Sequence, residues 1–253
     1  MPKIAIFINS PSNCFLTNIC NRIILNSINN SSTLEDNLSI QILDYNSWNI
    51  PNSELGHGLL LKTSRGNIKT IVHQSEELQT DKAIIWLCGA GGGFEGPANG
   101  MYRTISESLK NTIRSIRVDY REPNVLSECV LDVLSALSFL KTLGHSSVIL
   151  VGHSFGGAVV ITAAEFSDLV TGVISLSSQS YGTTKVANIA PRSLLLLHGG
   201  SDTRLPPEIS EKIYMYAKEP KEIKFFPGNG HGLRESSREI TLLVENWILK
   251  ILE

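Results

Sequence analysis

From residue 82 to the C-terminus, short apolar runs alternate with longer amphipathic segments, and this alternation constrains the fold more than any other feature. The apolar runs predict buried strands at residues 83–87, 115–120, 147–152, 172–177, 193–199 and 222–226. The segments between and after them predict helices over residues 125–143, 156–166, 207–218 and 236–252. Strands that are apolar along their whole length and alternate with amphipathic helices are typical of a mostly parallel sheet with helices on both faces. The sequence therefore predicts an α/β fold.

The N-terminal part of the chain is less regular, and we expect residues 1–56 to be an extension of a main domain that spans residues 57–253. Apolar runs at residues 3–8 and 38–43, with a helical stretch near residues 17–29 between them, predict a βαβ-like unit. We expect this extension to pack on the edge of the main sheet. A separate nucleotide- or flavin-binding unit is the alternative, but the segment lacks the glycine fingerprint of such units.

Charge and cysteine content narrow the classes of partner and compartment. The formal net charge is −2 and no block of Lys or Arg stands out, so we expect no nucleic-acid partner, which would require a concentrated basic face. No apolar run approaches the length of a transmembrane helix, and the run near the N-terminus is too short for a signal peptide, so we expect no membrane insertion. The four cysteines, at positions 14, 20, 88 and 129, form no CxxC pair or disulfide framework, which predicts free thiols and a cytoplasmic location. A targeting segment removed before residue 1 is the open alternative.

Residues 152–156 read GHSFG, a Gly-x-Ser-x-Gly pattern between a predicted strand and a helix of small residues. In a nucleophile elbow this pattern puts the serine on a strained strand-to-helix turn, and the glycines let neighbouring backbone approach without a Cβ clash. The turn would project Ser154 Oγ above the carboxyl edge of the sheet, in front of a helix N-terminus that favours developing negative charge. A tight glycine turn with a purely structural role is the alternative. The strand–turn–helix context favours Ser154 as a nucleophile.

A serine hydroxyl needs an adjacent base, so the hypothesis requires a histidine at the same edge of the sheet. Of the six histidines, His231 stands in a glycine-rich loop between the last predicted strand and the last helix, and this loop lies at that edge. His153 occupies the elbow, with its side chain expected to point away from that of Ser154, and we expect His198 to shape a turn. The sequence therefore predicts His231 as the general base.

The base needs an orienting acid from a loop that follows a strand between the serine and the histidine. The loop after residues 172–177 contains no carboxylate, whereas the next loop places Asp202 directly after its strand. Asp119 ends an earlier strand, and we expect it to hold the nearby loop through Arg121. Asp202 is therefore the predicted acid of a catalytic triad.

The order serine, acid, histidine, together with the order of the strands, resembles the α/β-hydrolase superfamily over about residues 57–252. Within that superfamily the sequence is most similar to small esterases and dienelactone-hydrolase-like members with little or no cap. The resemblance implies an α/β-hydrolase fold, with a mostly parallel central sheet and helices on both faces. It also implies that Ser154, Asp202 and His231 cleave an acyl bond through an acyl-enzyme, with no cofactor and no metal ion.

The resemblance further implies an oxyanion hole built from two backbone N–H groups. One belongs to the residue after the nucleophile, here Phe155, and the other to Ala90, with Gly91 as the alternative. Family members usually start this loop with His-Gly, whereas this chain has Cys88 and Gly89, which leaves the loop geometry open. A phosphate-binding loop is the alternative for the glycine run, but the Gly-Lys-Ser/Thr of a Walker loop is absent from it. We expect Cys88 to be a buried, inert thiol.

The sequence gives only indirect evidence about the substrate. Only about 15 residues, 178–192, occupy the place where many relatives insert a lid, which predicts an open site. Candidate pocket walls are Phe94, Met101, Tyr102 and Tyr181, and ordinary packing is the alternative for each of them. We expect a small-molecule acyl substrate, carboxylic ester hydrolysis as the leading reaction, and a monomer or homodimer. Thioesterase, peptidase, lactone-opening and acyltransferase activities would use the same residues, and a non-catalytic binding module is the alternative from a different class.

Overall fold

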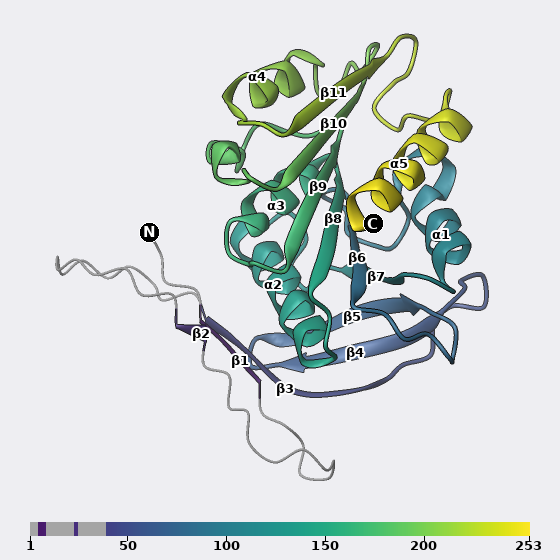
Figure 1. Cartoon of the computed structure of the whole chain (residues 1–253), viewed down its shortest axis with the longest axis vertical. Helices are drawn as coiled ribbons and strands as arrows, with labels where there is room; N and C mark the ends of the chain where they lie inside the picture. The colour runs from purple at the N-terminus through teal and green to yellow at the C-terminus, as the bar shows by residue number, and fades with distance from the viewer. Residues whose placement is uncertain (1–4, 9–22, 25–38) are drawn as a thin grey trace, which may run out of the picture.

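A single twisted sheet with helices on both faces makes up the molecule, as the computed structural model shows for residues 5–8, 23–24 and 39–253 (Figure 1). Helices α2, α3 and α4 cover one face, and α1 and α5 cover the other. None of the helices in these described ranges is long and apolar enough to cross a membrane.

Within the residues that the structure describes, the sheet has eleven strands in the order β11-β10-β9-β8-β6-β7-β5-β4-β3-β1-β2. Their bounds are β1 Ala5–Ile8, β2 Ile23–Ile24, β3 Ser39–Ser47, β4 His57–Thr63, β5 Gly66–His73, β6 Lys82–Leu87, β7 Arg114–Asp119, β8 Ser147–His153, β9 Val170–Leu176, β10 Ser193–Gly199 and β11 Lys221–Phe226. The helices are α1 Pro97–Leu109, α2 Leu126–Thr142, α3 Phe155–Ala164, α4 Glu208–Tyr216 and α5 Ser237–Leu252, with one 3-10 turn, η1 Val186–Asn188.

Strands β6 to β11 are all parallel, which confirms the predicted class of fold. Strand β5 runs antiparallel to β7, and the hairpin to β4 and the next strand β3 continue the antiparallel half. Because parallel strands end at the same edge of a sheet, the loops after β6, β8, β10 and β11 gather at one edge. That edge carries the predicted catalytic residues.

The predicted strands and helices beyond residue 82 all coincide with observed elements, and their ends differ by at most two residues. Helix α1 was missed, because its first turn lies in a glycine-containing stretch that predicts a loop. Ala98, Asn99 and Gly100 in that turn have positive φ values of 51°, 58° and 81°, so the regular helix begins only after them. Met101 and Tyr102 therefore lie on a helix and not in the loop.

The N-terminal extension joins the same sheet. Strand β3 pairs antiparallel with β4, and β1 pairs parallel with β3, as a βαβ unit requires. Ile23 and Ile24 form the short strand β2, antiparallel to β1, so the helix predicted over residues 17–29 is wrong at these two positions. The rest of that predicted helix, together with Cys14 and Cys20, lies outside the described residues.

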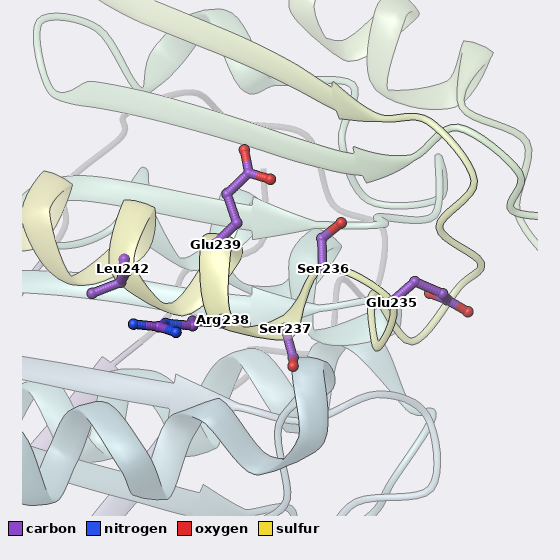
Figure 2. Close-up of a pocket in the computed structure, with 6 residues that line it drawn as sticks. All are labelled: Glu235, Ser236, Ser237, Arg238, Glu239 and Leu242. Carbon is purple, nitrogen blue, oxygen red and sulfur yellow. The ribbon is translucent and has the colours of Figure 1, made fainter.

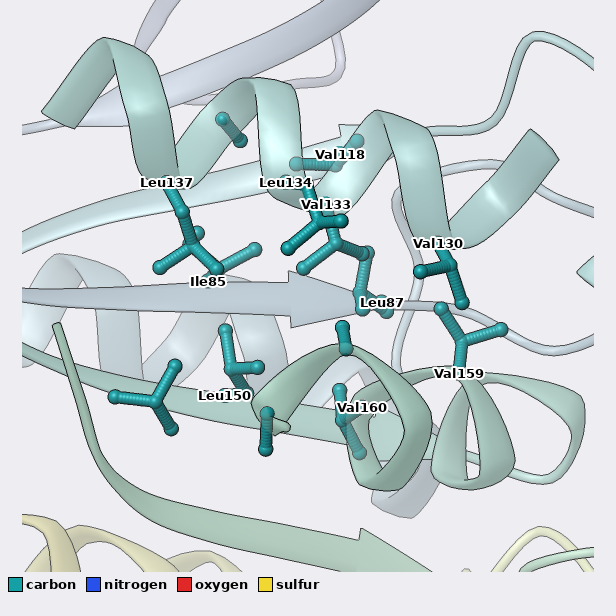
Figure 3. Packing of buried hydrophobic residues seen from close by; sticks show 14 of the residues in the cluster. Ile85, Leu87, Val118, Val130, Val133, Leu134, Leu137, Leu150, Val159 and Val160 are labelled. Carbon is teal, nitrogen blue, oxygen red and sulfur yellow. The ribbon is translucent and has the colours of Figure 1, made fainter. Parts of the chain in front are cut away.

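The hydrophobic core lies in two layers, one on each face of the sheet. Alternate residues of β6 point to opposite layers: Ile85 and Leu87 meet α2 and α3, whereas Ile84 and Trp86 meet α1 and α5. Figure 3 shows the first layer, where valine and leucine side chains of α2 interdigitate with those of β6, β8 and α3. Full burial of such a side chain stabilises the fold by about 1.5–3 kcal/mol, so this layer fixes α3, and with it the elbow, against the sheet.

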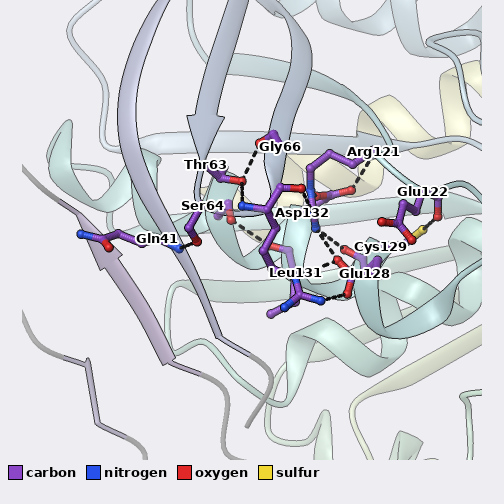
Figure 4. A network of polar contacts seen from close by, with 12 residues as sticks. Gln41, Thr63, Ser64, Gly66, Arg121, Glu122, Glu128, Cys129, Leu131 and Asp132 are labelled. Atoms are coloured by element: carbon purple, nitrogen blue, oxygen red, sulfur yellow. Dashed lines mark hydrogen bonds and ion pairs between the residues drawn. The ribbon is translucent and has the colours of Figure 1, made fainter. Parts of the chain in front are cut away.

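An ionic cluster ties the β4–β5 hairpin to α2 and the end of β7 (Figure 4). Arg121 donates to the buried carboxylate of Asp132 from both its backbone N–H and its guanidinium, and its Nη2 reaches Glu128 at 3.0 Å. Glu128 also pairs with Arg65. Burial raises the pKa of Asp132 to about 6, although Arg121 opposes this shift. The predicted link between Asp119 and Arg121 is therefore wrong, because Arg121 is engaged by α2.

Candidate active site

The predicted elbow is present where β8 meets α3. Ser154 lies between them with φ 59° and ψ −116°, a conformation that costs a non-glycine residue about 1–3 kcal/mol. A Cβ on Gly152 would lie 2.1 Å from the carbonyl oxygen of Gly156, and a Cβ on Gly156 would lie 2.4 Å from that of Cys88. Both glycines are therefore required by close backbone contacts. The backbone of Ser154 is held by hydrogen bonds from its N–H to Leu176 and from Gln179 to its carbonyl group.

The predicted acid and base are in direct contact. His231 Nδ1 lies 2.7 Å from Asp202 Oδ2, and the other carboxylate oxygen accepts backbone hydrogen bonds from Arg204 and Leu205 at 2.9 and 3.0 Å. Burial alone would raise the pKa of Asp202, but these N–H groups and the imidazole bind the carboxylate and hold its pKa below the usual value. An anionic Asp202 makes Nδ1 the donor, which leaves Nε2 of His231 as the basic nitrogen.

A second histidine shares the carboxylate. His198 Nε2 lies 3.3 Å from Asp202 Oδ2 and 2.9 Å from the carbonyl oxygen of Leu205, and its Nδ1 lies 2.7 Å from Ser210 Oγ. Burial lowers the pKa of His198, which favours the neutral ring with Nε2 as donor. His198 therefore shapes the turn, as the sequence predicts, and also contacts the acid. Its position four residues before Asp202 is the sequence signal that could have revealed this contact.

His153 supports the loop of His231. Its Nε2 lies 2.9 Å from the His231 carbonyl oxygen, and the two imidazole rings have centroids 4.8 Å apart. Burial lowers the pKa of His153 to about 4, so its ring is neutral and donates through Nε2. The elbow thus contacts the histidine loop through His153, the residue directly before Ser154.

The glycine loop after β6 passes beside Ser154. A Cβ on Gly89 would lie 3.8 Å from Ser154 Oγ, and Ala90 and Gly91 follow at exposed positions. Phe155 is the first residue of α3, so its N–H has no partner within the helix. The predicted oxyanion donors thus lie on two different segments, Phe155 directly after Ser154 and Ala90 directly after Gly89.

Side chains from β6 and β7 hold the glycine loop. An oxygen of Asp119 accepts the N–H of Gly93 at 2.6 Å, and the Cys88 thiol donates to the carbonyl oxygen of Glu95. Tyr120 donates its hydroxyl to the carbonyl oxygen of Cys88 at 3.1 Å. Burial raises the pKa of Cys88, which confirms the expected buried and unreactive thiol. Asp119 does hold the nearby loop, by itself and without Arg121.

The structure separates the candidate pocket walls into two groups. Met101 and Tyr102 are fully buried in the core, where the Tyr102 hydroxyl donates to the carbonyl oxygen of Leu87 at 3.0 Å. Their predicted role as pocket walls is therefore wrong, and packing is their role. Tyr181 is 72% exposed, and Phe94 is partly exposed on the glycine loop.

Two recesses lie near this edge of the sheet. The first, of about 350 Å³, lies between the end of the glycine loop and the histidine loop, and its polar lining includes Glu95, Asn99, His153 and Arg234. The second, of about 530 Å³, lies at the start of α5 and contains no predicted site residue (Figure 2). Within the described ranges, no group of three or more His, Cys, Asp and Glu side chains is arranged to hold a metal ion.

Comparison with solved structures defines the class of fold. Est1E from Butyrivibrio proteoclasticus superposes with a TM-score of 0.68 at 15% identity, covering 76% of this chain and 98% of that one. A dienelactone hydrolase from Anabaena variabilis gives a TM-score of 0.65 at 16% identity, covering 75% and 94%. XC6422 from Xanthomonas campestris, described as an α/β serine hydrolase without a lid, gives 0.62 at 15% identity, covering 80% and 97%. The fold is that of the α/β hydrolases.

Sequence comparison gives the family. A model of the dienelactone hydrolase family matches residues 90–246, and the chain therefore belongs to this family. The Escherichia coli protein YfhR, described as uncharacterized, is 31% identical over a segment that covers 40% of this chain and 44% of YfhR. The chain thus matches less than half the length of this curated relative.

Proposed function

We propose that the protein is a serine hydrolase that cleaves a carboxylic ester or a related acyl bond. The observation that carries the proposal is the contact of 2.7 Å between His231 Nδ1 and the buried Asp202, at the edge of the sheet where Ser154 occupies a strained elbow. Membership of the dienelactone hydrolase family supports the same reaction class. The names of the structural neighbours, which include esterases, agree with it.

In the proposed mechanism, His231 Nε2 takes the proton of Ser154 Oγ as this oxygen attacks the acyl carbonyl carbon. The imidazolium that forms is stabilised by Asp202, whose carboxylate stays anionic. The N–H groups of Phe155 and Ala90, with Gly91 as the alternative to Ala90, bind the oxyanion of the tetrahedral intermediate. His231 then protonates the leaving alcohol, and an ester of Ser154 remains.

In deacylation, His231 acts first as a base towards water and then as an acid towards Ser154 Oγ. Water loses a proton to His231 and attacks the acyl carbon, and the second tetrahedral intermediate uses the same two N–H groups. Collapse of this intermediate returns the proton to Ser154 and releases the carboxylic acid. The cycle uses only side chains and backbone groups of this chain, and the catalytic domain would extend over residues 57–253.

The proposed substrate is a small acyl compound. The segment between β9 and β10 is short and contains only the turn η1, so no helical lid stands over the elbow from this segment. Tyr181 on that segment and Phe94 on the glycine loop are the proposed contacts for an apolar part of the substrate. The polar recess beside the histidine loop would suit a hydrophilic part.

The test is labelling with a fluorophosphonate followed by mass spectrometry of the adduct. We expect the label on Ser154 and its absence from Ser154→Ala, together with a loss of at least about 10⁴-fold in kcat on p-nitrophenyl acetate. The matched control is Ser180→Ala, which removes an exposed hydroxyl nearby and is expected to keep both signals. A folded wild type that takes no label at Ser154 would overturn the proposal and favour a binding role.

A further inference from the structure

Arg117 on β7 is a fully buried arginine, with only 1% of its surface exposed, and it lies directly beneath the glycine loop. Its Nη2 forms an ion pair of 2.6 Å with Glu54, and its Nη1 makes a long contact of 3.5 Å with the carbonyl oxygen of Phe94. Its guanidinium carbon also lies 5.9 Å from the centroid of the Phe94 ring. Arg117 therefore links the N-terminal extension, through Glu54, to the loop that borders Ser154.

Two further contacts fix the orientation of Arg117, and one of them is the hydrogen bond of 3.3 Å from its Nη2 to the carbonyl oxygen of Leu55. Its Nε donates to His73 Nε2 at 3.0 Å, and His73 Nδ1 lies 2.5 Å from a carboxylate oxygen of Glu107. Burial lowers the pKa of His73, so the ring is neutral, accepts from Arg117 and donates to Glu107. A buried guanidinium is costly unless it is paired, and the carboxylate that pairs with this one comes from Glu54.

A second contact joins the same two segments. The indole of Trp48, which directly follows β3, stacks on the Phe94 ring with centroids 5.9 Å apart and planes inclined by 23°. Trp48 is itself anchored, because its Nε1 donates to the carbonyl oxygen of Thr70 on β5 at 2.9 Å. The ring of Phe94 therefore contacts both Trp48 and Arg117.

We propose that residues 48–55 of the N-terminal extension are a positioning element for the glycine loop, and that they act through Glu54 on Arg117 and through Trp48 on Phe94. The loop starts with Cys88 and Gly89, and contacts at Gly93, Phe94 and Glu95 hold it in place. The loop then presents Ala90 to the oxyanion in a fixed geometry. This inference rests on the proposed function, since it assigns the extension a role in the same site.

The decisive measurement compares Glu54→Ala with Glu54→Gln on p-nitrophenyl acetate. We expect Glu54→Ala to lower kcat about tenfold with little change in KM, because a displaced oxyanion donor weakens transition-state binding and spares substrate binding. Glu54→Gln should restore most of kcat, since its amide oxygen still accepts from Arg117. The pH profile of kcat/KM should keep its shape in both variants, because the His231–Asp202 pair is untouched.

The matched control is Asp44→Asn on the same extension, which breaks an exposed ion pair of 3.3 Å with Lys62 on β4, away from the glycine loop. We expect it to keep wild-type kcat. Trp48→Leu removes the stack on Phe94 without leaving a buried charge unpaired. If circular dichroism shows Glu54→Ala to be unfolded, Trp48→Leu decides the question, with an expected loss of several-fold in kcat and in the labelling rate of Ser154.

The outcomes separate the two proposals. A wild type without label on Ser154 overturns the proposed function. A wild type that is labelled and active, with folded Glu54→Ala and Trp48→Leu variants that match Asp44→Asn in kcat, overturns the positioning role alone.

Discussion

The elbow and the glycine loop border the same serine, Ser154, but the chain builds them in different ways. In the elbow, Gly152, Ser154 and Gly156 lie within five consecutive residues that span the end of β8 and the start of α3, and the turn conformation follows from that short stretch. The glycine loop has no regular structure of its own before α1. Its shape depends on β7, through Asp119 and Arg117, and on a segment some forty residues earlier in the chain.

This difference matters because glycine-rich backbone loses more conformational freedom on folding than other backbone does. A run of glycines can take many shapes, so a fixed oxyanion donor requires contacts from outside the loop. The backbone conformation of the elbow is restricted by the close packing of Gly156 against Cys88 and by the buried helix α3 that follows it. The two regions are therefore expected to respond differently to substitution.

The largest effect is expected from breaking the elbow itself. In Gly156→Ala, the new Cβ would lie 2.4 Å from the carbonyl oxygen of Cys88 and 2.7 Å from that of Leu87, and neither backbone group can rotate away. We expect the elbow to shift, with a loss of at least about 100-fold in kcat/KM and a free energy of unfolding lower by about 1–3 kcal/mol. Ester turnover and thermal unfolding measure the two effects. Wild-type values for both would contradict the close packing described for the elbow.

A smaller effect is expected when one contact of the glycine loop is removed. In Asp119→Ala, the N–H of Gly93 loses its acceptor. We expect the loop to shift slightly away from Ser154 and kcat to fall about tenfold. Asp119→Asn keeps an oxygen in place and should retain most of the activity. The control Asp81→Ala removes a carboxylate that binds Ser146 Oγ away from the glycine loop, and it should match the wild type. Equal kcat for all three variants would show that Asp119 does not hold the loop.

The last effect concerns stability and not activity, and it tests the burial of His153 in the elbow. Because burial lowers the pKa of His153 to about 4, the unfolded chain binds a proton at this residue between pH 6.5 and 4 that the folded chain does not. The free energy of unfolding should therefore fall as the pH falls through this window, by up to about 1.4 kcal/mol per pH unit from this one group. His153→Gln should reduce the slope in urea titrations at a series of pH values. If the free energy of unfolding of the variant depends on pH as steeply as that of the wild type, His153 is not buried in its neutral form.

The sequence was sufficient where local patterns dominate. The apolar strands from β6 onward and the helices after α1 were predicted within two residues, since burial on both faces leaves a strong periodic signal. Met101 and Tyr102 were misplaced as pocket walls, because a left-handed turn over residues 98–100 precedes a regular helix and hides its start. The contact of His198 with the acid was missed, because a spacing of four residues between His198 and Asp202 indicates a contact only once the shape of the turn between them is known.

The sequence by itself determined the class of fold, the glycine–serine turn and the candidates Ser154, Asp202 and His231, because each depends on a short stretch or on the order of elements along the chain. The tertiary structure decided how Asp202 is shared by two histidines, how Asp119 and Arg117 hold the glycine loop, and how Glu54 and Trp48 reach that loop from the N-terminal extension. These contacts join residues from several separate segments of the chain. Their partners are selected by burial and by the need to pair a buried charge, which no pattern of neighbouring residues encodes.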